Sequence, residues 1–247
     1  MRLSVVIPAY NEASRLPATL DEIVGYLSRH PTWCPAEIVV VDDGSADATF
    51  TVARRAATAD GVTIVCRSHS ANHGKGAAVR SGFRSSRGEH VLLSDADMAT
   101  PISEIERLAG AAPLGIAVGS RAVDRGRIQR RQPLHRDLMG RVFNLAVRCL
   151  AIGGINDTQC GFKLFHGDLA RELAAAQRID GFAYDVELLA RARRWGFEIR
   201  EVSVRWSHVE ASRVQPLQHS TEMFLDLLRI SYWRLTGKLD PPEPSEE

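Results

Sequence analysis

The sequence predicts an α/β fold with a doubly wound, mostly parallel sheet, and three observations support this prediction. Short apolar runs rich in β-branched residues alternate with longer amphipathic stretches, as in strands joined by crossover helices. Polar clusters follow the apolar runs, where such sheets bind ligands. No repeat or low-complexity linker divides the 247 residues, of which 45% are hydrophobic. One domain with a sizeable core is therefore expected.

The first half of the chain supplies most of this sheet. Strands are expected at residues 3–8, 37–43, 62–66, 90–94 and 115–120. Helical spacing marks residues 12–29, 47–58 and 75–86. The polar clusters that end the strands are "AYNE", "DDGS", "SDAD" and "SR". A ligand site built from these clusters is expected at one edge of the sheet.

The second half is less regular. Residues 121–136 are strongly basic and contain Gly and Pro, so we expect a mobile loop there. The elements expected after it are a helix at 137–152, a strand at 162–165, helices at 168–177 and 183–195, a strand at 197–206 and a helix at 217–235. The chain ends in "LDPPEPSEE", which predicts a disordered tail over 237–247.

Composition excludes several classes of protein. A total of 31 Lys and Arg against 30 Asp and Glu leaves a net charge of +1, so no overall field favours nucleic acid as a partner. No window approaches the ~18–20 apolar residues of a membrane span, and the first apolar run is too short for a signal peptide. The cysteines form no metal-binding or disulfide pattern: Cys34, Cys66, Cys149 and Cys160. A cytoplasmic protein is expected.

The stretch "SDADMATP" places Asp95 and Asp97 directly after the fourth expected strand. Alternation along an extended segment sends both carboxylates to one side and Ala96 to the other. Two carboxylates this close raise each other's pKa unless a cation lies between them. A hard divalent ion that also binds substrate phosphates fits such a pair, and simple solvation of a loop is the alternative.

Two other motifs each allow two interpretations. "DDGS" presents Asp42 and Asp43 either to the base and ribose of a nucleotide or to a turn, with Asp47 capping the next helix. "NHGKGAAVRSG" fits neither the Walker nor the dinucleotide-binding glycine pattern. Lys75 and its small neighbours still offer donors to an anion, and an ordinary first helical turn is the alternative.

The order of the motifs resembles one known family. The motifs "VVIPAYNE", "VVVDDGS", "NHGKGAAVRSG", "SDADMATP", "GSR", "DTQCGFKLF", "FAYDVELL" and "VRWSHVEASRV" occur in the order found in inverting family 2 glycosyltransferases of the GT-A fold. Residues 3–235 are most similar to the dolichyl-phosphate β-glucosyltransferase branch, close to the polyprenyl-phosphate mannosyltransferases. The resemblance implies one GT-A domain over 1–236, with a nucleotide-sugar half at 1–120 and a C-terminal acceptor-side extension at 121–236.

The resemblance also implies roles for the polar clusters. The donor is expected to be UDP-glucose or GDP-mannose. The residues expected to bind it are Pro8, Ala9, Tyr10, Glu12, Asp42, Asp43, Lys75, Asp95, Ala96 and Asp97. Asp97 is the expected ligand of Mg²⁺ or Mn²⁺, with Asp95 near the sugar, the ribose or the same metal. Arg121 of "GSR" is expected to face the phosphates.

Two departures from the family pattern bear on the sugar and the acceptor. The mannosyl branch carries a glutamine two positions beyond the second aspartate, where this chain has Ala99, so glucose is favoured. The glucosyl branch usually has "EGSK" where this chain has "EASR", with Ala211 for a glycine and Arg213 for a lysine. The second departure alters the expected geometry of that loop.

The acceptor implied is a polyprenyl phosphate in a membrane, and its chemistry needs cations more than a base. A phosphate monoester with a second pKa near ~6 is already a dianion at pH 7. A sugar hydroxyl ionises only near ~15, about eight pKa units above pH 7. Ionising it without a base would cost on the order of 11 kcal/mol, so a hydroxyl acceptor would need a base. Seven arginines crowd residues 121–141, either as a solvated face or as an acceptor loop. The acceptor-binding candidates, led by Arg136, are Arg121, Arg131, Arg136, Lys163 and Arg213.

Asp185 and Glu187 of "YDVELL" are about 200° apart on a helix, so both cannot face one substrate atom. Asp185 is expected to face the sugar, or to act as a base if the acceptor is a hydroxyl. A pair that only complements the helix dipole is the alternative. Cys160 is expected to pack. The candidate catalytic residues are Asp95, Asp97, Asp185, Arg121 and Arg136.

The helices expected at 137–152 and 217–235 each have an apolar stripe that fits either a core or a membrane surface. A peripheral location on the inner face of the membrane is expected, and a homo-oligomer or a membrane-protein partner stays open. Two rival functions are a glycosyltransferase of the same fold with a soluble hydroxyl acceptor, and a non-catalytic nucleotide-sugar-binding protein. A nucleotidyltransferase fits less well, because its glycine-rich basic N-terminal signature is missing.

Overall fold

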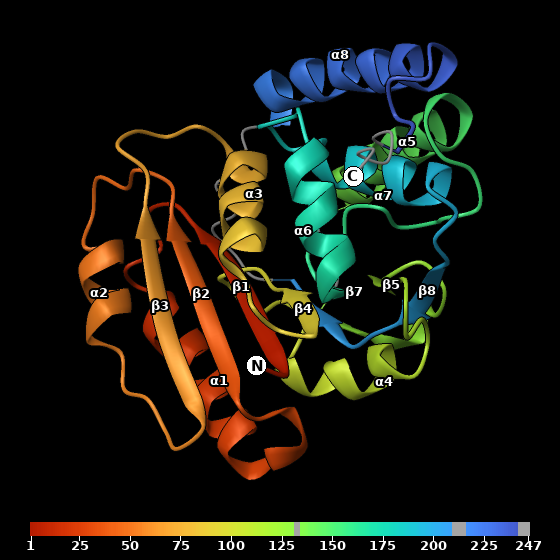
Figure 1. The fold of residues 1–247 in the computed structure, drawn as a ribbon. Helices are drawn as coiled ribbons and strands as arrows, with labels where there is room; N and C mark the ends of the chain where they lie inside the picture. The colour runs from red at the N-terminus through yellow and green to blue at the C-terminus, as the bar shows by residue number, and fades with distance from the viewer. Residues whose placement is uncertain (131–133, 209–215, 242–247) are drawn as a thin grey trace, which may run out of the picture.

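A computed structural model describes residues 1–130, 134–208 and 216–241, without the side chains of 134–138 and 216–220. A seven-stranded sheet forms its centre, and helices cover both faces (Figure 1). The predicted doubly wound, mostly parallel sheet is therefore confirmed.

The sheet draws strands from both halves of the chain. Its strands are β1 (Leu3–Ala9), β2 (Ala36–Asp42), β3 (Val62–Ser68), β4 (His90–Leu93), β5 (Ile116–Ser120), β7 (Lys163–His166) and β8 (Ile199–Ser203). Their spatial order is β3-β2-β1-β4-β7-β5-β8. Only β7 runs antiparallel to its neighbours, β4 and β5, in this part of the structure. A strand from the second half thus lies inside the sheet.

Eight α-helices are present in the described residues. They are α1 (Leu16–Arg29), α2 (Thr49–Arg55), α3 (Lys75–Ser85), α4 (Ile105–Ala109), α5 (Leu134–Leu150), α6 (Gly167–Ala176), α7 (Tyr184–Arg194) and α8 (Pro216–Leu235). Short 3₁₀ turns also occur, at η1 (Pro31–Trp33), η2 (Ile102–Glu104) and η3 (Arg125–Arg127).

Strand β1 shows why the sheet is covered on both faces. All seven of its residues are buried, as expected of a parallel strand with helices on both sides. Val6 belongs to the same buried cluster as Phe83 of α3. Its neighbour Ile7 belongs to a second cluster with Leu20 of α1. Alternating side chains therefore build two cores, one on each face of the sheet.

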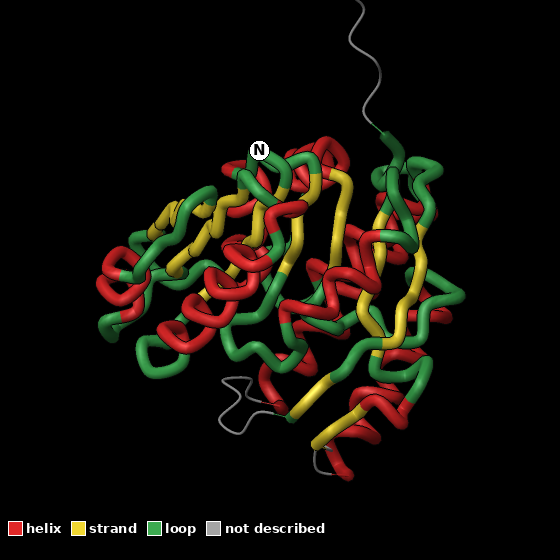
Figure 2. The backbone as a smooth tube through the Cα atoms, turned by 90° about the horizontal axis from the view of Figure 1, so that it is seen from below, coloured by secondary structure: helices red, strands yellow, loops and turns green. Residues whose placement is uncertain are grey.

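The expected strands and helices of the first half are present, with ends moved by a few residues. The basic segment differs from its prediction, because β6 (Ile128–Arg130) pairs with β9 (Trp206–Ser207) in a separate two-stranded sheet (Figure 2). The strand expected at 197–206 is accordingly split between β8 and β9. The partner of β6 lies far away in the sequence, so composition alone could not reveal this pairing.

The predicted disordered tail is wrong for residues 237–240. Leu239 is buried, and Trp195 Nε1 donates a hydrogen bond to its carbonyl oxygen at 2.9 Å. Arg194 also forms an ion pair with Asp240. One buried leucine anchors this segment despite its polar surroundings. Residues 242–247 lie outside the described part of the chain.

Helices α5 and α8 pack against each other, so the core interpretation holds for part of each apolar stripe. Val147 of α5 and Leu227 and Ile230 of α8 are buried. Further apolar side chains of the two helices are exposed to solvent: Met139, Val142, Leu145, Phe224, Leu225, Leu228, Tyr232 and Leu235. Among the described residues, no helix has both the length and the hydrophobicity to cross a bilayer.

Candidate active site

The polar clusters meet at the carboxyl edge of the sheet, as predicted. Strands β2, β1 and β4 are parallel neighbours, so the residues that follow them lie at the same edge. Asp42 ends β2, Tyr10 follows β1 and Asp95 follows β4. Because β7 is antiparallel, its first residue, Lys163, pairs with Leu93 at this same edge.

Asp95 is held by a lysine from the first turn of α3. Lys75 Nζ donates to Asp95 Oδ1 at 2.6 Å. Burial opposes ionisation of Asp95, but the charge and hydrogen bond of Lys75 outweigh burial and lower the pKa of this carboxyl. Burial likewise opposes the charge on Lys75, yet Asp95 raises the pKa of the ammonium group. The two groups therefore form a charged pair inside the site.

Asp97 lies in the turn that follows Asp95. Met98 adopts the left-handed backbone conformation, with a φ of 49°, and Asp97 Oδ1 accepts a hydrogen bond from the Ala99 N–H at 3.1 Å. Burial and then the negative charge of Asp95 raise the pKa of Asp97. A nearby cation would stabilise the ionised form.

The carboxylates fit a metal that shares its ligands with a substrate. Carboxylate oxygens are hard ligands of the kind that Mg²⁺ and Mn²⁺ prefer. In the described part of the chain, no cluster of three or more His, Cys, Asp or Glu side chains offers a complete metal cage. A metal at Asp97 would need further ligands from phosphate or water, which is how Mg²⁺ is usually held.

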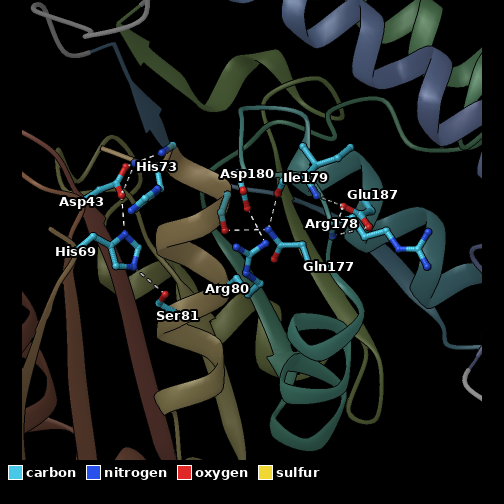
Figure 3. A network of polar contacts seen from close by, with 12 residues as sticks. Asp43, His69, His73, Arg80, Ser81, Gln177, Arg178, Ile179, Asp180 and Glu187 are labelled. Carbon is cyan, nitrogen blue, oxygen red and sulfur yellow. Dashed lines mark hydrogen bonds and ion pairs between the residues drawn. The ribbon is translucent and has the colours of Figure 1, made fainter. Parts of the chain in front are cut away.

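Asp43 binds the loop that leads into α3 (Figure 3). Its carboxylate accepts hydrogen bonds from the backbone N–H of His73 at 3.1 Å and of Gly74 at 2.8 Å. His69 Nδ1 lies 2.7 Å from Asp43 Oδ1, and His69 Nε2 lies 2.8 Å from Ser81 Oγ. Asp43 therefore connects β2 to α3, a role that the sequence did not reveal.

The other candidate donor residues follow β1 and β2. Asp42 Oδ1 accepts from the Ser45 backbone N–H and hydroxyl, so the turn interpretation of "DDGS" holds for this oxygen. Tyr10 is 39% exposed, which leaves its ring open to a ligand. Glu12 is buried, and Arg15 Nε donates to it at 2.6 Å. Glu12 thus lies beside the site and is neutralised by Arg15.

Arg121 contacts a carboxylate from the second half of the chain. Its Nε and Nη2 each donate to Asp157 at 2.7 Å, in a bidentate pair. Burial opposes the charge on Asp157, but Arg121 lowers the pKa of this carboxyl. The guanidinium carbon also lies 5.3 Å from the ring centroid of Trp206. Arg121 is therefore fixed between β5 and β9.

Lys163 and Asp185 form a buried pair beneath the site. Lys163 is 1% exposed, its Nζ donates to the Cys160 carbonyl at 2.6 Å, and it lies 3.5 Å from Asp185 Oδ2. Burial raises the pKa of Asp185 although Lys163 opposes the shift. Burial also raises the pKa of the Cys160 thiol to about 11, in agreement with the predicted packing role. Lys163 has no surface from which to contact an acceptor directly.

Comparison with known proteins identifies the family. Residues 4–173 match Glycosyl transferase family 2. The chain belongs to this family. Its relatives in the glycosyltransferase family 2 include the dolichyl-phosphate beta-glucosyltransferase of Homo sapiens, 39% identical over 254 residues, with 96% of this chain and 76% of the relative covered. The Mus musculus protein of the same name is 40% identical over 251 residues, with the same shares covered. The protein is therefore a glycosyltransferase.

Two solved structures share the fold of this chain. Glucosyl-3-phosphoglycerate synthase from Mycobacterium tuberculosis, in complex with UDP, has a TM-score of 0.64 at 20% identity, over 95% of this chain and 80% of the other. Mannosyl-3-phosphoglycerate synthase from Rubrobacter xylanophilus has a TM-score of 0.67 at 19% identity, over 96% of this chain and 76% of the other. The family 2 glycosyltransferase described here therefore has the GT-A fold.

Three candidate acceptor residues of this glycosyltransferase cannot be placed. Arg131 and Arg213 lie outside the described residues, and the side chain of Arg136 does as well. The structure therefore leaves their roles as predictions. Pro8 and Ala9, in contrast, are the last residues of β1 at the carboxyl edge, and Ala96 lies three residues beyond the end of β4.

Several residues that shape the site were missed from the sequence. Thr19 of α1 is buried and donates to the Ala96 carbonyl at 2.7 Å, which fixes the turn between the two aspartates. Gly161 lies against Asp95 so closely that an added Cβ would overlap the carboxylate. Trp206 and Gly161 line a small hollow beside Asp95. Each residue comes from a distant part of the sequence. Gly161 and Trp206 stand in the motifs "DTQCGFKLF" and "VRWSHVEASRV", whereas no motif pointed to Thr19.

Proposed function

We propose that the chain transfers glucose from UDP-glucose to a dolichyl or other polyprenyl phosphate, with inversion at the anomeric carbon. The observation that carries this proposal is the similarity to dolichyl-phosphate beta-glucosyltransferases over 96% of the chain. Because the similar region includes both the donor edge and the acceptor half, it supports the sugar and the acceptor together. Ala99, where the mannosyl branch has a glutamine, favours glucose over mannose.

Donor binding is proposed at the carboxyl edge of the sheet. Tyr10 is exposed enough to contact the uracil ring, and Asp42 is proposed to accept hydrogen bonds from the base or ribose. The diphosphate is proposed to lie near Lys75 and Asp97, where the ammonium supplies positive charge. In support, a related glucosyl-3-phosphoglycerate synthase was solved with Mn²⁺ and UDP.

Asp97 is the proposed ligand of Mg²⁺ or Mn²⁺, with Asp95 beside it. The metal, when bound, supplies Lewis-acid charge that stabilises the departing diphosphate. The chain's own contribution is preorganisation. Lys75 adds a second cation 2.6 Å from Asp95, and the Ala99 N–H orients the Asp97 carboxylate.

The acceptor phosphate is proposed to attack without a general base. It is a dianion at pH 7, because its second pKa is near ~6. Arg136, followed by Arg131 and Arg213, is proposed to bind it bidentately. Arg121, fixed by Asp157, contributes charge at the edge of the site. Asp185 is proposed to face the sugar, with Lys163 holding its carboxylate in place.

The proposed location is peripheral, on the inner face of the membrane. The exposed apolar residues of α5 and α8 support it, because an apolar patch on a protein surface usually marks an interaction site. Arg141 and Arg148 of α5 are exposed beside this patch and suit anionic lipid headgroups.

The test is transfer of labelled glucose into lipid. The protein is incubated with UDP-[¹⁴C]glucose, Mn²⁺ and dolichyl phosphate, and label is counted in the organic phase. We expect label with dolichyl phosphate and none with dolichol, which lacks the phosphate. Asp97→Ala is expected to lose transfer, whereas Asp60→Ala, an exposed site, keeps it. A parallel assay uses labelled GDP-mannose as the donor. Lipid label only from GDP-mannose, or lipid label from neither donor, contradicts the proposed function.

The rival hydroxyl acceptor is separated by the kcat of Asp185→Asn, measured at pH 8. A phosphate acceptor is already a dianion at this pH and needs no base, so the loss should stay well below about 10²-fold. A hydroxyl acceptor needs a carboxylate base such as Asp185, and the variant would then cost about 10²–10⁴-fold in kcat.

A further inference from the structure

The first turn of α3 is bound by a short segment between α6 and α7, residues 177–180, which we name the clamp segment (Figure 3). Gln177 Nε2 donates to the Gly76 carbonyl and to the Ile179 carbonyl, each at 2.8 Å. The Ala77 N–H donates to the Asp180 carbonyl at 3.2 Å. Arg80 of α3 also forms an ion pair with Asp180 at 2.6 Å.

Two glycines let the clamp segment approach the helix closely. Gly74 has a φ of 103°, in the region that favours glycine, and a Cβ there would overlap the Asp180 carbonyl oxygen. A Cβ on Gly76 would lie 2.5 Å from the Ile179 carbonyl oxygen and 2.7 Å from Tyr184 Cβ. The residue between these glycines, Lys75, is therefore fixed on both sides by backbone packing.

The clamp segment is itself held rigidly. Glu187 of α7 is fully buried, and its carboxylate accepts from the backbone N–H of Arg178 at 3.0 Å and of Ile179 at 2.7 Å. Arg191 Nε also donates to Glu187 at 2.9 Å. Glu187 thus faces away from the active site and anchors the segment, while Asp185, two residues earlier, forms the pair with Lys163.

We propose that the clamp segment is a positioning device for Lys75, and that Gln177 is the positioning residue that links the two. The clamp segment sets where the Lys75 ammonium meets Asp95, and it ties the donor edge to α7, which carries Asp185. The effect of the clamp segment on donor binding rests on the proposed function. The effect of the clamp segment on the Lys75–Asp95 pair is independent of the proposed function.

The first experiment measures the reactivity of Lys75 by brief acetylation and mass spectrometry. Lys238 is exposed and serves as the internal reference. In Gln177→Met both donated hydrogen bonds are lost while the side-chain volume is nearly kept. The acetylation of Lys75 relative to Lys238 is expected to rise roughly fivefold, the equilibrium factor for the one lost bond that joins Gln177 to α3, at the Gly76 carbonyl.

Ser86→Ala is the matched control at the other end of α3. Ser86 is buried, and its hydroxyl donates to the Phe83 carbonyl at 2.7 Å. Its loss should lower the Tm by a similar amount and leave the Lys75 ratio unchanged. An unchanged ratio in Gln177→Met, or an equal rise in Ser86→Ala, shows that Gln177 only stabilises the fold and overturns the proposal.

The second experiment tests the consequence for the donor with UDP and Mn²⁺. The Kd is measured for Lys75→Met, for Gln177→Met and for the double variant. If Gln177 acts through Lys75, the double variant binds no more weakly than Lys75→Met alone, about tenfold below wild type. Independent effects that multiply to roughly 50-fold contradict the coupling. Failure of the wild-type protein to bind UDP refutes the proposed function instead, and the acetylation ratio then decides the role of Gln177 alone.

Discussion

At the scale of single residues, Asp95 and Asp97 are separated by one residue, yet their pKa values shift in opposite directions. Lys75 outweighs burial at Asp95 and lowers its pKa. At Asp97, burial and the charge of Asp95 raise the pKa. One carboxylate thus has its own cation, and a cation that approached the other would stabilise its ionised form. This asymmetry fits Asp97 as the metal ligand better than Asp95.

The pair of Asp157 and Arg121 predicts how acid affects stability. The ordinary pKa of Asp157 is 3.8, and Arg121 lowers it in the folded state. Its stabilising effect is therefore present above about pH 4 and is lost as the pH falls through the lowered value. Asp157→Asn should cost about 2–3 kcal/mol at pH 7, and the difference from wild type should shrink toward pH 2. Urea unfolding at several pH values measures it, and a difference that stays constant down to pH 2 contradicts the assignment.

Gly161 is predicted to be required for the position of Asp95. Because a Cβ there would overlap the carboxylate, Gly161→Ala should displace Asp95 and raise the Kd for UDP with Mn²⁺ by about tenfold or more. Gly110→Ala is the control, since nothing lies within 4 Å of its added Cβ. Calorimetric titration gives both values. Wild-type affinity in Gly161→Ala means that Asp95 does not depend on this glycine.

At the scale of elements, α3 carries Lys75 at its start and packs on β1 through Gly82. A Cβ on Gly82 would overlap Val6 Cγ1 and approach Val41 Cγ2 at 3.3 Å. Gly82→Ala should therefore destabilise the fold by about 1–3 kcal/mol through overpacking. Gly25→Ala, inside α1, meets only the Arg29 guanidinium at 3.5 Å and should stabilise by about 0.5–1 kcal/mol. Urea unfolding of both variants checks the prediction, and equal stabilities contradict it.

The sequence predicted the order of elements because strands and helices differ in local periodicity. It did not predict that β7 enters the sheet between β4 and β5, or that β6 pairs with β9, because pairing depends on contacts between distant residues. Asp95 and Asp97 could be proposed from their place after a strand. The ion pairs of Lys75 with Asp95 and of Arg121 with Asp157 could not, since they join side chains 20 and 36 residues apart.

At the scale of the whole molecule, the two proposed binding surfaces are separate. The carboxyl edge of the sheet is proposed to bind the donor, and the apolar surface of α5 and α8 is proposed to bind the membrane. Val142→Glu with Leu228→Glu places two charges on that surface, where the side chains are 61% and 44% exposed. Since each apolar side chain buried in lipid contributes about 1.5–3 kcal/mol, binding to anionic vesicles should fall by at least about tenfold. UDP binding should be unchanged.

The control for the membrane surface is Leu114→Glu. Leu114 is an exposed leucine just ahead of β5, at the edge of the sheet opposite the carboxyl edge. Vesicle flotation compares the variants with wild type. Equal binding by the wild type and the Val142→Glu, Leu228→Glu double variant, or equal loss in Leu114→Glu, contradicts the assignment of this surface.

The most direct test of the central claim, a divalent metal bound by Asp97 on the donor diphosphate, is anomalous diffraction at the manganese edge from crystals grown with UDP and Mn²⁺. We predict one peak about 2.1 Å from an oxygen of Asp97, with the diphosphate as its other ligand. A nucleotide bound with no manganese at Asp97, or a peak bound elsewhere, contradicts the account.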